Sequence, residues 1–313
     1  MRMAIVDLGT NSVHLFIVEL GRSGRVRVVR HECELVRLGE GGLVRGRLTQ
    51  TAMRRTLAVL QRYAATLARL QIACVEAVAT SAVRDAKNGR VFLRRARAAT
   101  RLPLRGISGL EEARLIYLGI HQTRPSARRR AVITIGGGSA QVMTGCGARL
   151  QYRASVPLGG ARLAQQFIQH DPPRPGEVEA LTRHVRRVWA PVVRAVRRAR
   201  WNEAVGGSAT MGQVMLAASG LARPNKKSST PPRSIGRLSL NRLIAWLARS
   251  TAARRRRLPA VDPRREALLL PTAVTLLAWM DGCGAATLRR VSGSLREGLV
   301  ADRLIRYHQG KGR

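Results

Sequence analysis

The sequence predicts an α/β fold built from two similar halves. Apolar strand-like segments alternate with amphipathic helices, which is typical of layered α/β domains. An apolar segment that runs into glycine and then serine occurs twice, as AIVDLGTNS at residues 4–12 and VITIGGGSA at residues 132–140. With 313 residues, of which 45% are hydrophobic, the chain is long enough to bury two cores. We expect two domains, 1–122 and 123–313, with the last helix able to pack back on the first.

The first half predicts strands and helices in alternation. Residues 4–20 predict two strands joined by a polar turn, and Val26–Val29 predict a third. Residues 49–70 predict a helix that Thr49 or Thr51 can cap. Its apolar face would consist of Leu57, Leu60, Ala64 and Leu67. The remaining elements are a strand at 75–80, a loop at 81–89 followed by a basic helix, a strand at 104–108, and a helix at 110–120 with an acidic first turn.

The second half repeats this alternation. A strand at 131–135 precedes two candidate partner strands at 141–144 and 150–156, and a helix follows Pro157. Pro191 should kink a long basic helix at 176–201. The later elements are a strand at 203–207, a loop at 223–236, a helix opened by Asp262 and Pro263, a strand at 288–292 and a helix at 296–307.

The net charge of +38 indicates a polyanionic partner. Residues 1–122 carry 21 basic and 9 acidic side chains, and residues 123–313 carry 35 and 9, so the second half holds most of the charge. Nucleic acid, an anionic membrane and polyphosphate are the candidates. Compositional drift is the alternative, because only four of the 56 basic residues are Lys. Drift explains Arg in place of Lys but not the scarcity of acids, so we favour a functional charge.

The spacing of the cysteines and the shortness of the apolar runs indicate a cytoplasmic protein that does not span a membrane. The four cysteines lie far apart and lack the spacing of metal ligands, so they are interpreted as small core residues in a reducing compartment: Cys33, Cys74, Cys146 and Cys283. No signal-like apolar core precedes Asp7. The apolar run at 267–280 is too short to span a bilayer and contains Pro271.

The two glycine-containing segments predict phosphate-binding loops. Glycine-rich turns after a strand expose backbone N–H groups that commonly cradle phosphate. Two such loops, one from each domain, can face each other across a cleft and grip one phosphate chain. The second segment, VITIGGGSAQV at 132–142, contains no acidic residue, which raises the question of whether it cleaves phosphate or only holds it.

Six motifs, in order along the chain, resemble those of the Ppx/GppA phosphatases, which are exopolyphosphatases and guanosine pentaphosphate phosphohydrolases. They are VDLGTNSVHL, ATSAVRDAKNG, ISGLEEARLIYLG, IGGGSAQV, VPLGGARL and GSLREGL. The resemblance implies two actin-like domains, of the ribonuclease H-like superfamily that includes hexokinase and Hsp70, flanking an interdomain cleft. Longer family members carry an additional helical domain, so this chain resembles the short two-domain type.

The resemblance also implies a site in which Mg²⁺ (or Mn²⁺) and an attacking water remove terminal phosphate. Glu112 is the implied general base and a metal ligand, and Asp7 is a second metal ligand. The implied phosphate-binding residues are Thr10, Asn11, Ser12, Arg84, Gly136, Gly137, Gly138, Ser139, Gly206, Gly207 and Ser208. A structural interpretation stays open, since acids suit the first turn of any helix, and Asn and Ser suit ordinary turns.

The second loop departs from the family pattern D-I-G-G-G-S-x-E. Thr134 stands at the Asp and Gln141 at the Glu, so both implied metal-positioning carboxylates are neutral here. Neutral oxygens bind Mg²⁺ more weakly than carboxylates. Smaller departures, at Pro271 and Ser294, fall in expected packing elements.

Two functions therefore follow from the sequence. The first is an exopolyphosphatase-like phosphoanhydride hydrolase acting on polyphosphate or guanosine pentaphosphate. The alternative is a catalytically degenerate protein that binds polyphosphate or a guanosine tetra- or pentaphosphate. Nucleic-acid binding is the weaker option, because aromatic residues are only 4% of the chain. The resemblance allows a homodimer, because family members often dimerise, but the sequence itself does not set the oligomeric state.

Overall fold

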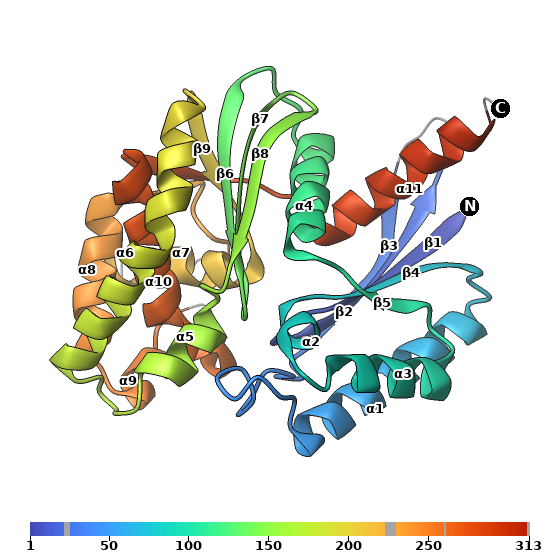
Figure 1. Ribbon diagram of the computed structural model, residues 1–313, viewed down its shortest axis with the longest axis horizontal. Coiled ribbons are helices and arrows are strands. Elements are labelled where there is room, and N and C mark those ends of the chain that lie inside the picture. Colours follow the sequence, from blue (N-terminus) through green and yellow to red (C-terminus); the bar gives the residue numbers. More distant parts are fainter. Residues whose placement is uncertain (22–25, 223–229, 260, 312–313) are drawn as a thin grey trace. The chain divides into compact units, whose positions relative to one another are not determined.

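The computed structural model describes residues 1–21, 26–222, 230–259 and 261–311 (Figure 1). The chain forms two compact units, Met1–Gln122 with Gly293–Arg313 (unit 1) and Thr123–Ser292 (unit 2). The sequence-based division assigned the whole of 123–313 to the second domain, while allowing its last helix to pack back. In the structure this helix, α11 (Leu295–Lys311), groups with unit 1.

Unit 1 is built on one mixed sheet. Its strands are β1 (Arg2–Leu8), β2 (Val13–Leu20), β3 (Val26–Glu34), β4 (Cys74–Ala79) and β5 (Leu104–Gly106), in the order β3-β2-β1-β4-β5. Strand β2 pairs antiparallel with both β1 and β3, whereas β1, β4 and β5 are parallel to one another. The register pairs Leu8 with Ala79 and Ala79 with Gly106, so the carboxyl ends of these three strands lie level. The helices are α1 (Gln50–Arg69), α2 (Ser81–Asp85), α3 (Gly89–Thr100), α4 (Gly109–Thr123) and α11.

Unit 2 repeats this topology with one strand added. Its strands are β6 (Arg129–Ile135), β7 (Ala140–Cys146), β8 (Arg149–Val156), β9 (Glu203–Gly206), β10 (Ser234–Gly236) and β11 (Thr287–Arg290), in the order β10-β11-β9-β6-β7-β8. The run β8-β7-β6-β9-β11 has the strand order and directions of β3-β2-β1-β4-β5, and β10 adds an antiparallel edge. The repeated topology confirms the predicted α/β fold of two actin-like domains.

The core of unit 2 is organised around one apolar helix. Its helices are α5 (Gly160–Phe167), α6 (Pro175–Arg198), α7 (Ala209–Ala222), α8 (Arg237–Ala248), α9 (Ala252–Arg256) and α10 (Glu266–Cys283), with a 3₁₀ turn at Pro263–Arg265. Helix α10 packs against α5, α6, α7 and α8. By length and composition alone, Pro263–Cys283 could cross a membrane, which corrects the expectation that this segment is too short; 78% of its apolar stretch is buried inside the structure. Buried Trp189 of α6 donates a hydrogen bond from Nε1 to the Thr275 carbonyl of α10 at 3.0 Å.

Several local predictions need correction. The predicted loop at 81–89 contains α2, because the Thr80 carbonyl accepts bonds from the amides of Val83 and Arg84. Of the predicted loop at 223–236, residues 223–229 lie outside the described residues, and Ser234–Gly236 form β10 by pairing with β11. Helix α6 runs without a break through Pro191, which lies on its exposed side; the kink expected there stays a prediction.

Burial also differs from the sequence-based expectation in two places. In α1, Leu57 and Ala64 are only half-buried. The buried face of this helix is Ala52, Met53, Thr56, Val59, Leu60, Tyr63 and Leu67. Among the cysteines only Cys283 is buried, whereas Cys33 is exposed and the other two are half-buried. The interpretation of all four as core residues was therefore wrong.

The start of α6 supplies a pH-dependent stability prediction. Glu177 accepts hydrogen bonds from the amides of Gln169 and Arg174 at 2.9 and 3.0 Å and contacts His170 Nδ1 at 2.8 Å. Desolvation alone would raise the pKa of Glu177, but these hydrogen bonds lower it to about 2. Because the folded pKa lies below the ordinary value of 4.5, the stabilisation is complete above that pH and is lost as the pH falls towards 2.

We expect Glu177→Gln to lower the melting temperature by about 2–4 °C at neutral pH, as for the loss of a helix cap. The difference from the unmodified protein should shrink as the pH falls through the acidic range. The control is Glu179→Gln, which removes an exposed carboxylate paired only with Arg183. Equal effects of the two substitutions in thermal denaturation would contradict the assignment of the cap.

Candidate functional site

Two hairpin loops share one backbone hydrogen-bonding plan. Residues 9–12 join β1 to β2, and residues 136–139 join β6 to β7. In the first loop the Gly9 amide donates to the Ser12 carbonyl, and in the second Gly136 donates to Ser139, both at 2.9 Å. In each loop the next three N–H groups have no hydrogen-bond acceptor within the described chain. Consecutive free N–H groups in a turn are suited to binding an anion. That these two loops bind phosphate stays a prediction from the sequence.

Side chains of the first loop add further donors. The amide nitrogen Nδ2 of Asn11 is buried and has no partner among the described residues. Ser12 Oγ lies 3.0 Å from His14 Nε2, and His14 Nδ1 lies 3.2 Å from His31 Nε2. The sequence analysis missed both histidines. His14 could have been found as part of the quoted motif VDLGTNSVHL, whereas His31 lies on the next strand and carried no signal.

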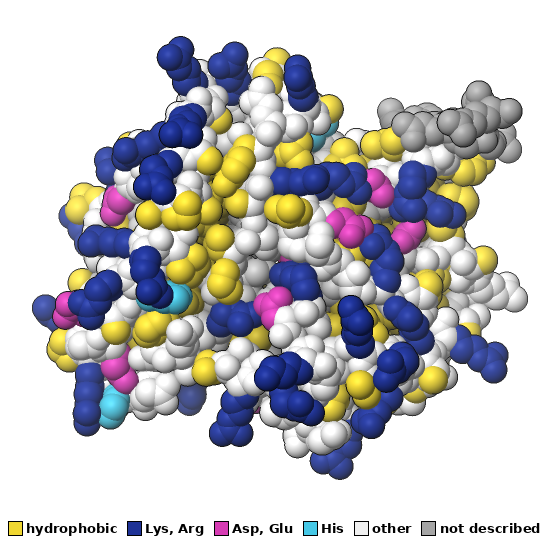
Figure 2. Space-filling view, in the orientation of Figure 1, with side chains coloured by type: hydrophobic (Ala, Val, Ile, Leu, Met, Phe, Trp, Pro, Cys, Tyr) yellow, Lys and Arg dark blue, Asp and Glu magenta, His cyan; other side chains and the backbone are white. Residues whose placement is uncertain are grey.

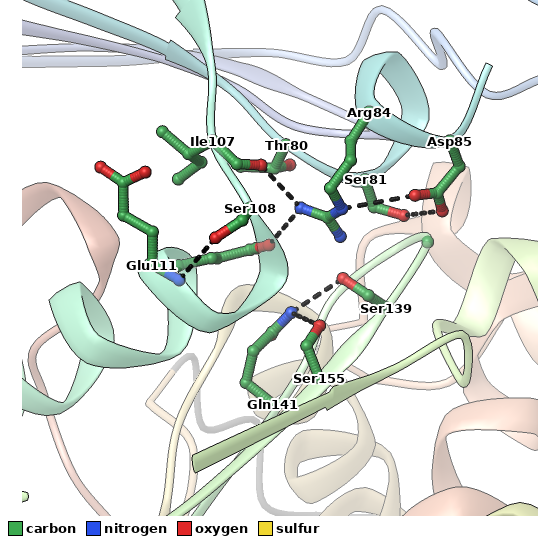
Figure 3. Close-up of polar contacts among 12 residues, drawn as sticks. Thr80, Ser81, Arg84, Asp85, Ile107, Ser108, Glu111, Ser139, Gln141 and Ser155 are labelled. Atoms are coloured by element: carbon green, nitrogen blue, oxygen red, sulfur yellow. Dashed lines mark hydrogen bonds and ion pairs between the residues drawn. The ribbon is translucent and has the colours of Figure 1, made fainter. Parts of the chain in front are cut away.

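The second loop contains a neutral hydrogen-bonded network at the two positions that depart from the family pattern. Thr134 and Gln141 are cross-strand partners on β6 and β7, and both are buried. Thr134 Oγ1 donates to Gln141 Oε1 at 3.3 Å. Gln141 Nε2 donates to Ser139 Oγ at 2.8 Å and to Ser155 Oγ at 3.2 Å (Figure 3). Both ends of the amide are thus satisfied without a cation, so these residues do not fit a metal ion.

The carbonyls of the second loop are engaged by the start of α5. The amides of Gly160 and Ala161 donate to the carbonyls of Gly136 and Gly137 at 2.9 and 2.8 Å. A Cβ on Gly159 would lie 2.4 Å from the amide nitrogens of Gly138 and Ser139, so this close approach requires glycine. The motif VPLGGARL therefore holds the loop through hydrogen bonds to its carbonyls and through the close approach of Gly159.

The third predicted loop follows β9. Ser208 Oγ donates to the Ile135 carbonyl at 2.7 Å and accepts from the Met211 amide at 3.1 Å. A Cβ on Gly207 would lie 2.3 Å from the Val291 carbonyl. The Ser208 hydroxyl thus ties this loop to the end of β6, which positions Gly207 beside the second loop's strand.

In unit 1, polar side chains gather at the level carboxyl ends of β1, β4 and β5. Arg84 of α2 donates from Nη1 to Glu112 Oε2 of α4 at 3.0 Å and to the Ile107 carbonyl at 3.2 Å. Its Nε lies 3.3 Å from Asp85 Oδ1, so the guanidinium is held from three directions (Figure 3). Arg84 is therefore not a freely solvated arginine.

The two acids at the start of α4 lie in different environments. Glu111 is half-buried and pairs with Arg105 at 2.8 Å. Glu112 is buried, and its desolvation raises its pKa to about 7, with Arg84 opposing the shift and the nearby charge of Asp7 adding to it. An acidic first turn needs neither burial nor a raised pKa, so Glu112 has the properties of a functional carboxylate.

Asp7 lies just before the first loop and lacks a counter-ion in contact. Its carboxylate makes no hydrogen bond or ion pair within the described part of the chain. Burial raises its pKa, Arg296 of α11 opposes this and Glu297 adds to it. A desolvated carboxylate of this kind fits a hard cation that keeps waters and substrate oxygens as its other ligands. The described residues contain no cluster of three or more metal-binding side chains, so such a cation would need those other ligands.

The repeated hairpin loops, with the carboxylates of Asp7 and Glu112, make up the candidate site of this α/β protein. Residues 17–307 match the Ppx/GppA phosphatase family, and the chain belongs to that family. This membership confirms the resemblance and the class of phosphoanhydride hydrolase.

Similar proteins cover nearly the whole chain. Exopolyphosphatase 1 of Mycobacterium tuberculosis is 30% identical over 309 residues, which are 97% of this chain and 88% of that protein. Exopolyphosphatase 1 of Mycobacterium leprae is 29% identical, over 97% and 90%. The crystal structure of an exopolyphosphatase from Cytophaga hutchinsonii superposes with a TM-score of 0.87 at 26% identity, covering 97% and 98% of the two chains. An Aquifex aeolicus family member, at 24% identity and a TM-score of 0.79 over 98% of each chain, shares the fold.

Proposed function

We propose that this protein is an exopolyphosphatase that releases the terminal phosphate of polyphosphate. The observation that carries the proposal is the pair of matched loops, each with three unpaired N–H groups, in a chain of the Ppx/GppA family. The similarity to proteins named exopolyphosphatase supports polyphosphate as the substrate.

In this proposal each loop binds phosphate and takes no part in breaking the anhydride bond. The free N–H groups of residues 10–12 and 137–139 would donate to phosphate oxygens, and Asn11 Nδ2 and the Ser12 hydroxyl would add side-chain donors. Arg84 would bind the phosphate nearest Glu112, since its guanidinium already lies against that carboxylate.

Glu112 is the proposed general base. It would accept a proton from a water that attacks the terminal phosphorus; the new P–O bond forms as the anhydride P–O bond breaks, and the shortened chain leaves as an anion. A carboxylate with a pKa near neutrality suits this role. A bound Mg²⁺ or Mn²⁺ would neutralise charge on the transferred phosphate, and Asp7, with Glu112, would hold it.

A second candidate function rests on the Thr134–Gln141 network. Because this neutral pair replaces two implied carboxylates and needs no cation, the protein would bind polyphosphate or a guanosine penta- or tetraphosphate without hydrolysing it. The two candidates share the loops and differ only in turnover.

Phosphate release from long-chain polyphosphate, with Mg²⁺ or Mn²⁺, distinguishes them when measured beside a binding titration in EDTA. We expect tight binding at low salt, metal-dependent release, and weaker release from guanosine pentaphosphate. Binding without release under any metal condition would favour the second candidate. The absence of both binding and release would rule out both.

A further inference from the structure

The positive charge of unit 1 is concentrated in one helical layer. Residues 41–75 and 86–104, which contain α1 and α3, carry 12 basic and no acidic side chains. The rest of unit 1 carries 14 basic and 11 acidic side chains. Helices α1 and α3 pack against each other. Compositional drift would spread the imbalance evenly, so this separation indicates a surface built for a polyanion.

The basic side chains of this α1–α3 layer are exposed and mostly without acidic partners. Figure 2 shows dark blue side chains over the part of unit 1 where Figure 1 places α1 and α3. Arg55 and Arg62 pair with Glu40 and Glu34 at its border. Ten others are exposed and make no ion pair with any acid that the structure describes: Arg45, Arg47, Arg54, Arg69, Lys87, Arg90, Arg94, Arg95, Arg97 and Arg101.

Three of these arginines form a stripe along α3, and Arg101 follows at the C-cap of the helix, where φ is 57°. At 100° per residue, Arg90, Arg94 and Arg97 fall within an arc of about 60° and span about 10 Å. The buried side of the helix, with Phe92, Leu93 and Ala96, faces away from this arc. A regularly spaced row of cations matches a linear chain that carries one charge on every repeating group.

Backbone hydrogen bonds connect this layer to the first phosphate-binding loop. The amides of Arg37 and Gly39 donate to the carbonyls of Asn11 and Thr10 at 2.9 and 3.0 Å. Further along the same segment, the Gly46 carbonyl accepts from the Lys87 amide at 2.8 Å, just before α3. One continuous segment, residues 37–48, therefore holds the loop at one end and the start of the basic stripe at the other.

We propose that the α1–α3 layer binds the distal part of a polyphosphate chain whose end lies at the first loop; this inference rests on the proposed function. Single-stranded nucleic acid is the competing polyanion. It is disfavoured because nucleic acid is bound by stacking bases on exposed aromatic rings. The aromatic residues of the layer, Tyr63 and Phe92, are 1% and 2% exposed.

The test compares two triple variants of equal charge change. The stripe variant, Arg90→Gln/Arg94→Gln/Arg101→Gln, removes two arginines of the stripe and the C-cap arginine, and it spares Arg97, whose Nε donates to the Leu104 carbonyl. The control, Arg186→Gln/Arg194→Gln/Arg198→Gln, removes three exposed arginines from α6 in unit 2. Binding of long-chain polyphosphate and of tripolyphosphate is titrated in EDTA, so that the result does not depend on turnover.

The stripe variant should bind long-chain polyphosphate about tenfold more weakly than the control and bind tripolyphosphate equally well. Its log–log salt dependence should be shallower by about two to three, because three phosphate contacts are lost. Equal long-chain affinity of the two variants would overturn the inference. So would a loss confined to an oligonucleotide probe, which would indicate a nucleic-acid surface. Stripe-dependent binding without any phosphate release would sustain this inference while the proposed hydrolysis fails.

Discussion

Glu112→Gln is expected to reduce phosphate release from polyphosphate by about 10²–10⁴-fold, the usual contribution of a general base. Glutamine keeps the size of the side chain and can still accept a hydrogen bond from Arg84, which lies 3.0 Å from the carboxylate in the unmodified protein. It cannot accept a proton from water. Polyphosphate binding in EDTA should therefore change little, and the loss should appear in kcat.

The neighbouring residue provides the matched control. Glu111→Gln removes the same charge one position earlier on α4, where the half-buried carboxylate pairs with Arg105. This variant should retain activity within a few-fold. If the two substitutions lower the rate equally, the loss reflects the charge of the helix start, and Glu112 is not the base.

The loops were predictable because each is a local pattern. A hairpin is specified within about 15 residues by a short apolar strand, a turn with glycine and a second alternating strand. Both loops can therefore be predicted from the sequence. Their equivalence follows as well, since residues 4–12 and 132–140 repeat one plan and the structure gives both the same hydrogen bond across the turn.

The differences between neighbouring residues were not predictable in this way. Glu111 and Glu112 are adjacent and chemically identical, and only the packing of α4 leaves one half-buried beside Arg105 and buries the other beside Arg84. The His14–His31 contact joins strands that pair through tertiary structure, which no short motif records. The short strand β10 forms only because β11, about 50 residues later, supplies its partner.

The two neutral positions of the second loop were likewise only partly predictable from the sequence. The family resemblance implies carboxylates at the positions of Thr134 and Gln141, but the sequence does not show that these two side chains bond to each other. The structure shows them as direct cross-strand partners joined at 3.3 Å. Two carboxylates at these buried positions would repel each other and would need a cation between them. The replacements thus change the loop from one that requires a cation to one that is stable without it.

Restoring both acids with Thr134→Asp/Gln141→Glu should therefore make the stability of the protein depend on a metal ion bound at the second loop. Without metal the variant should melt at a lower temperature than the unmodified protein, and Mg²⁺ or Mn²⁺ should recover the loss. Titration with Mn²⁺ should show tighter binding. The control, Gln151→Glu/Gln166→Glu, adds two carboxylates at exposed positions of unit 2 and should show neither effect.

Phosphate release then decides what the natural replacements do. If they have cost catalysis, the restored variant should hydrolyse polyphosphate faster by about 10²–10⁴-fold, with a stronger dependence on metal, and Glu112→Gln in that background should remove the gain. If the unmodified protein already turns over rapidly and loses this activity with Glu112→Gln, the neutral pair is sufficient and the binding-only function is excluded. If neither form hydrolyses polyphosphate while both bind it, the second loop holds phosphate through its N–H groups alone, because those groups are free whichever side chains stand at 134 and 141.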